Sequence, residues 1–156
     1  KYISWLNDHD VNTYMYTGRT PVSMDQIKFN FEKTIMFAII ADLSGDLDFS
    51  SSNYIGTISL SNIDWINRSC DVGYLIGDKS YWGKGIATRI VALVTDYAFN
   101  RINLHKIEAG VVDVHKASIR VLEKNEFKKY AEVPEDYYLN GVYHKTYMFY
   151  KINGKK

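Results

Sequence analysis

The segment over residues 72–88 joins a strand-like apolar run to a helix through a glycine-rich turn. Gly83 and Gly85 lack a Cβ atom, so the backbone here can bend sharply and bring several N–H groups close to a ligand. From Ile86 to about Phe99, apolar residues recur every three or four positions, which predicts a helix. Its N-terminus would offer free N–H donors and a positive dipole end, so the segment predicts a cradle for a phosphate or pyrophosphate.

Two common phosphate-binding loops do not fit this spacing. A nucleotide-triphosphate loop ends in Gly-Lys-Ser or Gly-Lys-Thr, whereas Gly85 is followed by Ile86 and Ala87. The dinucleotide fingerprint has a third small residue three positions after its second glycine, where this chain has Thr88. Because Gly-x-Gly alone also occurs as a plain tight turn, the flanking sequence has to decide.

Hydrophobic periodicity predicts a single α+β domain over residues 1–156 with a central mixed sheet. A start signal at Pro21 and Ser23 predicts a helix to about Lys33, after helical turns near residues 1–16. A polar tract over residues 42–53 indicates a hairpin loop. The predicted strands cover residues 36–41, 54–60, 70–77, 105–112, 127–132 and 142–151, and two further helices cover about 84–101 and 116–125.

Composition excludes several classes of protein. Lys and Arg number 19 and Asp and Glu 18, so the net charge is only +1. A charge this small produces no overall positive potential that would attract nucleic acid. The longest apolar run, residues 35–41, is far shorter than the roughly 20 residues of a membrane span. Cys70 is the only cysteine, so it has no internal disulfide partner and suits a reducing compartment. We therefore expect a soluble cytoplasmic protein with neither nucleic-acid nor membrane partners.

The flanks of the glycine turn resemble a known family. Residues 82–87, Trp-Gly-Lys-Gly-Ile-Ala, resemble the acyl-CoA pyrophosphate loop of the GNAT acetyltransferases, with Gly85 and Ala87 in the two small positions. Trp82 replaces the usual Gln or Arg, as in the branch similar to the ribosomal-protein N-terminal acetyltransferases. Residues 105–112 and 115–127 also resemble that branch, although His115 replaces its usual Asn and Glu126 its usual Gly. The resemblance covers about residues 53–151.

The resemblance implies a GNAT-like fold, a central mixed and mostly antiparallel sheet with splayed central strands flanked by helices. It implies acetyl-CoA as cosubstrate, with no metal. The pantetheine arm would lie against Tyr74, Leu75 and Ile76, with a further contact from His115. The chain opens in what looks like mid-helix, so the first N-terminal strand of the family is expected to be missing. The pyrophosphate would bind the backbone N–H groups of Trp82, Gly83, Lys84, Gly85, Ile86 and Ala87.

Acetyl transfer from a thioester to an amine requires a neutral amine, a stabilised oxyanion and a proton for the departing thiolate. Asp71 is the first candidate for the catalytic base, because relatives often carry Glu at this place in the strand. Glu108 and Asp64 are weaker alternatives, and a structural role explains each carboxylate as well. A backbone N–H near Tyr74 or Leu75 would bind the oxyanion if a bulge splays the strand there.

The second role to assign is that of the acid that protonates the departing thiolate. Many relatives use a Tyr in the helix after the fifth strand, but the matching residue here is Leu122. Ser118, at the serine of the family's Asn-x-x-Ser motif, would hydrogen-bond the thiol and is the second catalytic candidate. Alternatively, Ser118 and His115 simply begin a helix, since Ser is a favoured capping residue. His105 and His144 lack zinc-site spacing, and Cys70 lacks the partners of a nucleophile.

The sequence therefore predicts an acetyl-CoA-dependent N-acetyltransferase acting on a primary amine, with a slight preference for a small molecule such as an amino sugar. A protein N-terminal acetyltransferase and a non-catalytic acyl-CoA-binding module are the alternatives. The acceptor pocket is expected between the N-terminal helices and residues 137–144, although an ordinary hairpin with edge tyrosines explains the same residues. A second copy of the chain, in a homodimer, is a further candidate partner.

Overall fold

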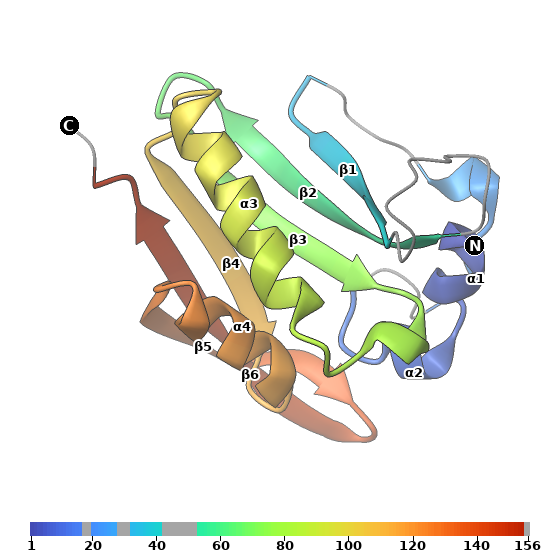
Figure 1. Cartoon of the computed structure of the whole chain (residues 1–156). Coiled ribbons are helices and arrows are strands. Elements are labelled where there is room, and N and C mark those ends of the chain that lie inside the picture. Colours follow the sequence, from blue (N-terminus) through green and yellow to red (C-terminus); the bar gives the residue numbers. More distant parts are fainter. Residues whose placement is uncertain (17–19, 28–31, 42–52, 155–156) are drawn as a thin grey trace.

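The computed structural model describes residues 1–16, 20–27, 32–41 and 53–154. Figure 1 shows α3 and α4 running across one face of a sheet. The helices are α1 (Tyr2–Leu6), α2 (His9–Asn12), α3 (Ile86–Asn100) and α4 (Lys116–Lys124), with the 3-10 turns η1 (Met24–Gln26) and η2 (Lys79–Tyr81). The strands are β1 (Ile35–Ile40), β2 (Tyr54–Asp64), β3 (Ser69–Ile76), β4 (Lys106–Val112), β5 (Lys128–Leu139) and β6 (Val142–Ile152).

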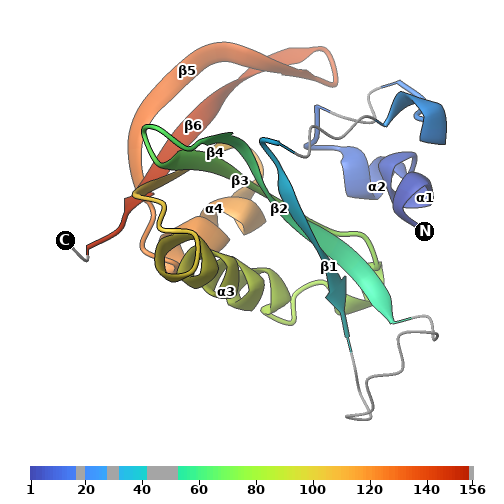
Figure 2. The ribbon, with the colours of Figure 1, turned by 90° about the horizontal axis from the view of Figure 1, so that it is seen from above.

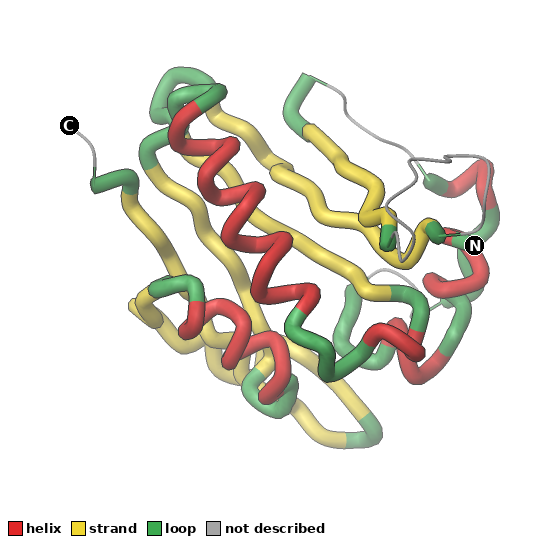
Figure 3. Tube along the Cα trace, in the orientation of Figure 1, coloured by secondary structure: helices red, strands yellow, loops and turns green. Residues whose placement is uncertain are grey.

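The six strands form one sheet in the order β1-β2-β3-β4-β6-β5. Every neighbouring pair is antiparallel except β3 and β4, which are joined through α3. Figure 2 shows the β5–β6 hairpin curving over the face of the sheet opposite α3 and α4. The tube in Figure 3 shows the same division, with the two longest helices on one side of the strands.

The two central strands separate along their length. Only Ser69, Cys70 and Asp71 of β3 pair with β4, opposite Lys106, Ile107 and Glu108. Beyond Asp71, β3 continues to Ile76 and β4 to Val112 without pairing to each other. The N–H and C=O groups that these strand halves turn toward one another are therefore available to a ligand. The α+β fold with a mixed, mostly antiparallel sheet and splayed central strands is confirmed.

The main core lies between the sheet and the two longer helices. Alternate residues of the strands, including Ile107 and Ala109, pack against Val91 and Val94 of α3 and Leu122 of α4. A second, smaller cluster lies on the opposite face, where Trp5, Leu6 and Val11 surround Leu75. Successive residues of a strand point to opposite faces, so β3 contributes to both clusters. Among the described helices, none has both the length and the apolar character that a membrane crossing requires.

Two predicted elements differ from the structure, and a third lies mostly outside the described residues. The predicted helix from Ser23 to Lys33 is wrong, because Ser23 and Gln26 form a capping box that starts only the single turn η1, and Ile27 is already extended. The predicted strand near residues 127–132 continues as β5 to Leu139. A register shift between Val133 and Tyr137 accommodates Pro134 on this edge strand. Most of the predicted hairpin loop over residues 42–53 lies outside the described residues.

The N-terminal region is helical, as the sequence predicted for residues 1–16, but the helices are short. The two helices α1 and α2 span five and four residues. Helices of this length are not stable alone, so their positions depend on what they pack against. The described residues before Ile35 contain helical segments, turns and irregular backbone, and no strand.

Candidate active site

The predicted anion cradle lies where β3 passes through η2 into α3. Gly83 and Gly85 have φ angles of 73° and 75°, in the left-handed region that favours glycine. Gly85 is the N-cap of α3, and no described atom lies within 4 Å of a Cβ placed at either glycine. The first N–H groups of this 15-residue helix have no acceptor within the helix, and together with the open space at the two glycines they suit an anion site. Residues 82–87 are called the glycine loop below.

The indole of Trp82 ties the glycine loop to the end of β3. Its Nε1 donates a hydrogen bond of 2.7 Å to the carbonyl of Ile76, while 44% of the residue remains exposed. Asp78 holds the turn between them, because its Oδ1 accepts hydrogen bonds from both the amide and the hydroxyl of Ser80. The sequence does not predict this role for Trp82, which explains how the loop is held where the family usually has Gln or Arg.

Tyr74 and Ser118 meet across the gap between the splayed strands. The Tyr74 hydroxyl lies 2.7 Å from the Ser118 hydroxyl, and Ser118 is buried in the first turn of α4. Burial raises the pKa of Tyr74 to about 12, so the phenol keeps its proton at neutral pH. Ser118 is the third residue of α4 and not its cap, whereas His115 is the N-cap, so the alternative that both residues begin the helix holds for His115. Leu122 is fully buried in the core.

The predicted pantetheine residues do not share a face. The side chains of Tyr74 and Ile76 pack on the core beside α3 and α4, whereas Leu75 belongs to the cluster of Trp5 and Leu6. Their backbone groups alternate between the two edges of β3 as well. The Leu75 carbonyl points toward Gly56 of β2, whereas Tyr74 and Ile76 face the splay, where the Ile76 carbonyl accepts the Trp82 hydrogen bond. A bulge near Tyr74 or Leu75 was the condition for an oxyanion-binding N–H there. The β2–β3 register is regular at these residues and shifts between Ser61 and Asp64 instead.

His115 is the N-cap of α4 and lies under an N-terminal side chain. Its ring stacks on that of Tyr14, with centroids 4.3 Å apart and an interplanar angle of 18°. Burial lowers the pKa of His115, so the imidazole is neutral at physiological pH. A neutral imidazole both donates and accepts a hydrogen bond, as the usual Asn at this position also does.

Asp71 occupies the last paired position of β3 before the splay. The β2 irregularity gives Asn62 a φ of 51° and aims its Nδ2 at Asp71 Oδ2, 2.7 Å away. Glu108 lies in register with Asp71 on β4 and contacts Lys106 and Tyr130 at 2.9 and 2.8 Å. Partial burial raises the pKa of Glu108, but these two hydrogen bonds outweigh it and hold the pKa below its usual range.

Asp64 is a turn residue, away from this pair of carboxylates. It accepts hydrogen bonds from the backbone N–H groups of Ile66 and Asn67 and from the Asn67 amide. These bonds hold the pKa of Asp64 below its usual range and fix the β2–β3 turn. The structure thus brings Asp71 and Glu108 together and separates Asp64 from them.

A cavity of about 360 Å³ lies between the N-terminal helices and the β5–β6 hairpin. Tyr137 joins the two sides, since its hydroxyl donates to the carbonyls of Thr13 and Met15 at 3.0 and 3.2 Å. Asn140 and Gly141 close the hairpin with φ angles of 50° and 84°, as in a tight two-residue turn. The cavity is lined by Asn7, His9, Asn12, Thr13, Pro21, Tyr137, Tyr138, Leu139 and Asn140.

Two residues expected in this pocket lie elsewhere. Tyr143 is 61% exposed and packs its ring against Tyr138, and it does not line the cavity. His144 pairs with Asp113, with Nδ1 and Oδ1 3.3 Å apart, a contact that joins β6 to the end of β4 and that the sequence did not suggest. No group of three or more metal-binding side chains gathers in the described ranges.

Known proteins resemble this chain both in sequence and in fold. The family profile described as "Acetyltransferase (GNAT) domain" matches residues 1–128. A probable N-acetyltransferase of Bacillus subtilis, YjcK, is 43% identical over 95 residues, which are 60% of this chain and 52% of that protein. The chain therefore spans about half the length of that relative.

Two further comparisons cover more of the chain. An uncharacterized N-acetyltransferase of Bacillus licheniformis, p20, is 35% identical over 126 residues, 80% of this chain and 70% of that protein. The crystal structure of spermidine N-acetyltransferase from Vibrio cholerae, in complex with CoA and spermine, superposes with a TM-score of 0.84 at 22% identity. It covers 99% of this chain and 89% of that one. The glycine loop, the splayed strands and these matches together show that the chain belongs to the GNAT acetyltransferase family.

Proposed function

We propose that this protein transfers the acetyl group of acetyl-CoA to a primary amine of a small molecule. One observation carries the proposal: β3 leaves β4 after Asp71 and leads directly into the left-handed glycine loop at the start of α3. The separated strand edges suit the amide-rich pantetheine arm, and the loop suits a pyrophosphate. The free, buried Cys70, whose pKa burial raises to about 12, suits the cytoplasm as the compartment.

The residues present fit the cosubstrate. Gly83 and Gly85 leave open space where the pyrophosphate would approach the N–H groups of residues 82–87. Tyr74 and the Ile76 N–H would bind the pantetheine through the β3 edge that faces the splay, with the neutral His115 as a further hydrogen-bonding partner. Leu75, whose carbonyl points toward β2, would contribute only through its position in the strand. The side chain that family members place at Leu122 is replaced by a buried aliphatic group, so the acid must come from elsewhere.

In the proposed reaction the amine nitrogen attacks the thioester carbonyl, and the C–S bond breaks as the tetrahedral intermediate collapses. Asp71 takes the proton of the ammonium, directly or through a water, because it lies at the point of separation. A β3 N–H turned toward the splay would hold the oxyanion. Ser118, hydrogen-bonded to Tyr74, would hold the departing thiolate, which takes up through water the proton that the acylated nitrogen releases.

The cavity favours a hydroxylated amine, such as an amino sugar, over a polycation. The described lining residues supply amides, hydroxyls and an imidazole, and none of them carries a carboxylate. A polyamine such as the spermine bound in the Vibrio cholerae enzyme carries several positive charges, which anionic groups would recognise. A volume of about 360 Å³ also suits a small ligand better than a protein chain.

The test is release of free CoA thiol from acetyl-CoA against a panel of amino sugars, polyamines and N-terminal peptides. We expect release with at least one amino sugar and a weaker response to spermidine. Turnover restricted to peptides would favour the protein N-terminal acetyltransferase. Binding of CoA with no thiol release for any amine would favour an acyl-CoA-binding module. Sedimentation of the same sample tests the homodimer, which remains a prediction.

A further inference from the structure

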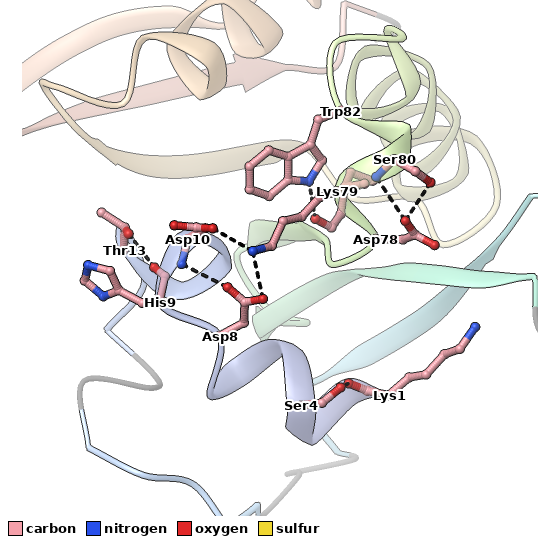
Figure 4. A network of polar contacts seen from close by, with 11 residues as sticks. Lys1, Ser4, Asp8, His9, Asp10, Thr13, Asp78, Lys79, Ser80 and Trp82 are labelled. Carbon is pink, nitrogen blue, oxygen red and sulfur yellow. Dashed lines mark hydrogen bonds and ion pairs between the residues drawn. The ribbon is translucent and has the colours of Figure 1, made fainter.

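A lysine between the glycine loop and the N-terminal helices contacts two carboxylates. Lys79, in η2, places its Nζ 2.9 Å from Asp8 Oδ2 and 2.6 Å from Asp10 Oδ2 (Figure 4). These contacts join segments that are 69 residues or more apart in the sequence. The hydrogen bonds that Lys79 donates to Asp10 and Asp8 hold the pKa of Lys79 above its usual range, so the contact is ionic at neutral pH.

The carboxylates belong to the helix that lines the cavity. Asp8 is the N-cap of α2 and accepts a hydrogen bond from the Asp10 N–H, so one side chain both starts the helix and binds Lys79. His9 and Asn12 of the same helix line the cavity. Because α2 has only four residues, its orientation depends on such contacts and not on its own stability.

A second, apolar contact fixes the same pair of segments. A Cβ at Gly77 would lie 1.9 Å from Trp5 Cδ2, so the indole of α1 packs directly on the backbone just after β3. On the other side, Trp82 and Asp78 tie residues 76–82 into one short connected unit. The N-terminal helices therefore rest on the segment that leads into the glycine loop.

We propose that Lys79 is a positioning residue through which the bound cosubstrate orders the acceptor side of the site. A pyrophosphate that fixes the glycine loop also fixes η2, and Lys79 passes this restraint to α2 and to the cavity wall. The coupling is reciprocal, so acetyl-CoA and the amine each bind better in the presence of the other. The inference rests on the proposed function and adds a coupling between its two binding regions.

The magnitude follows from the exposure of the groups. The side chains of Lys79, Asp8 and Asp10 are 43%, 34% and 67% exposed, so each pair alone is weak. Lys79 forms two ion pairs with the short helix α2. Removing both pairs is expected to change the local order of α2 several-fold without changing the global fold. Lys79→Met keeps most of the apolar stem and removes the charge, so it isolates the ionic contact.

The experiment is hydrogen exchange of backbone amides in residues 8–13, with and without CoA, for the wild type, Lys79→Met and Asp10→Asn. Lys124→Met removes an exposed lysine at the end of α4 as the matched control. Calorimetry of CoA binding runs in parallel. In the wild type and the control we expect CoA to slow exchange of these amides several-fold, and in Lys79→Met to slow it less than twofold. The CoA dissociation constant should stay within about threefold.

Equal protection of α2 in Lys79→Met and the wild type would overturn the inference, as would a wild type that binds CoA without any change in α2. A wild type that does not bind CoA overturns the proposed function itself, and calorimetry identifies that case. The double variant Lys79→Met with Asp10→Asn should lose no more protection than Lys79→Met alone. Additive losses would show that the two groups act separately.

Discussion

The two halves of the candidate site are built in different ways. The cosubstrate region consists of β3, η2, the glycine loop, α3 and α4, which follow one another closely in the sequence. The acceptor region consists of α1, α2 and the β5–β6 hairpin, and Tyr137 reaches Thr13 from 124 residues away. A site made of neighbouring segments leaves motifs in the sequence, whereas a site made of the two ends of the chain depends on tertiary packing.

The largest effect of a single substitution is therefore expected in the cosubstrate region. Asp71→Asn keeps the size of the side chain and an oxygen to accept the Asn62 hydrogen bond, but the amide takes no proton from an ammonium. We expect turnover to fall by about 10²-fold or more, with the CoA dissociation constant unchanged. A pH–rate profile of both proteins measures the effect.

Asp64→Asn is the control for that change, because Asp64 holds a turn and lies away from the splay. It should keep its turnover and lose about 1 kcal/mol of stability. If Asp71→Asn retains full turnover on the acidic side of the profile, the base lies elsewhere. Glu108→Gln would then be the next variant to measure.

A smaller effect is expected from Gly85→Val. The φ of 75° strains any β-branched residue, which costs about 1–2 kcal/mol, but open space around the position lets the protein fold. The branched side chain would occupy the approach of the pyrophosphate, so the CoA dissociation constant should rise at least about tenfold. Calorimetry with CoA and unfolding in urea separate affinity from stability.

Gly141→Val is the control, because it introduces a similar backbone strain away from the glycine loop. Gly141 has a φ of 84° and equally open surroundings in the β5–β6 hairpin. The variant should lose similar stability and keep its CoA affinity. A folded Gly85→Val protein with unchanged CoA affinity would remove the glycine loop from the binding site.

Much of the cosubstrate region was predictable because local rules decide it. Glycines at left-handed φ, a helix with apolar residues at regular spacing and a strand before them all appear in the sequence. What was missed there depends on contacts between elements. The Trp82 bond to Ile76, the Tyr74 contact to Ser118 and the bulge that aims Asn62 at Asp71 leave no periodic pattern.

The acceptor region was predicted only in outline. The start signal at Ser23 was read correctly, but nothing local shows that the helix ends after one turn. Tyr138 and Asn140 line the cavity as expected, while Tyr143 and His144 do not, because Tyr143 packs on Tyr138 from the next strand and His144 contacts Asp113. Asp8 and Asp10 find Lys79 only after folding.

A milder substitution tests whether the cavity of the acceptor region binds the amine. Tyr138→Phe removes one hydroxyl from the cavity wall and keeps the ring that packs on Tyr143. We expect the Michaelis constant for the amine to rise about three- to tenfold, the value of one hydrogen bond, with CoA affinity unchanged. Tyr143→Phe, outside the cavity, should change neither quantity. Equal effects from both variants would mean that the cavity does not bind the amine.

The smallest expected effect is on the stability of variants at Glu126, a position where the ribosomal-protein N-terminal acetyltransferases usually have Gly. Its φ of 63° lies in the left-handed region, and its side chain is 84% exposed while it contacts Lys151. Glu126→Gly should raise the free energy of unfolding by about 1 kcal/mol, because relief of the backbone outweighs a weak surface ion pair. Glu126→Gln keeps the backbone strain and should change little. Urea unfolding measures both, and a destabilised Glu126→Gly protein would show that the ion pair dominates.

The most direct measurement of the central claim is a titration of the isotope-labelled protein with CoA, followed by the shifts of its backbone amide resonances. We expect the largest shifts in residues 74–76 and 82–87, with a further change at His115, since these residues belong to the splayed end of β3, the glycine loop and the start of α4. Shifts concentrated in the β5–β6 hairpin, or no saturable shift at all, would contradict a cosubstrate bound between β3 and β4.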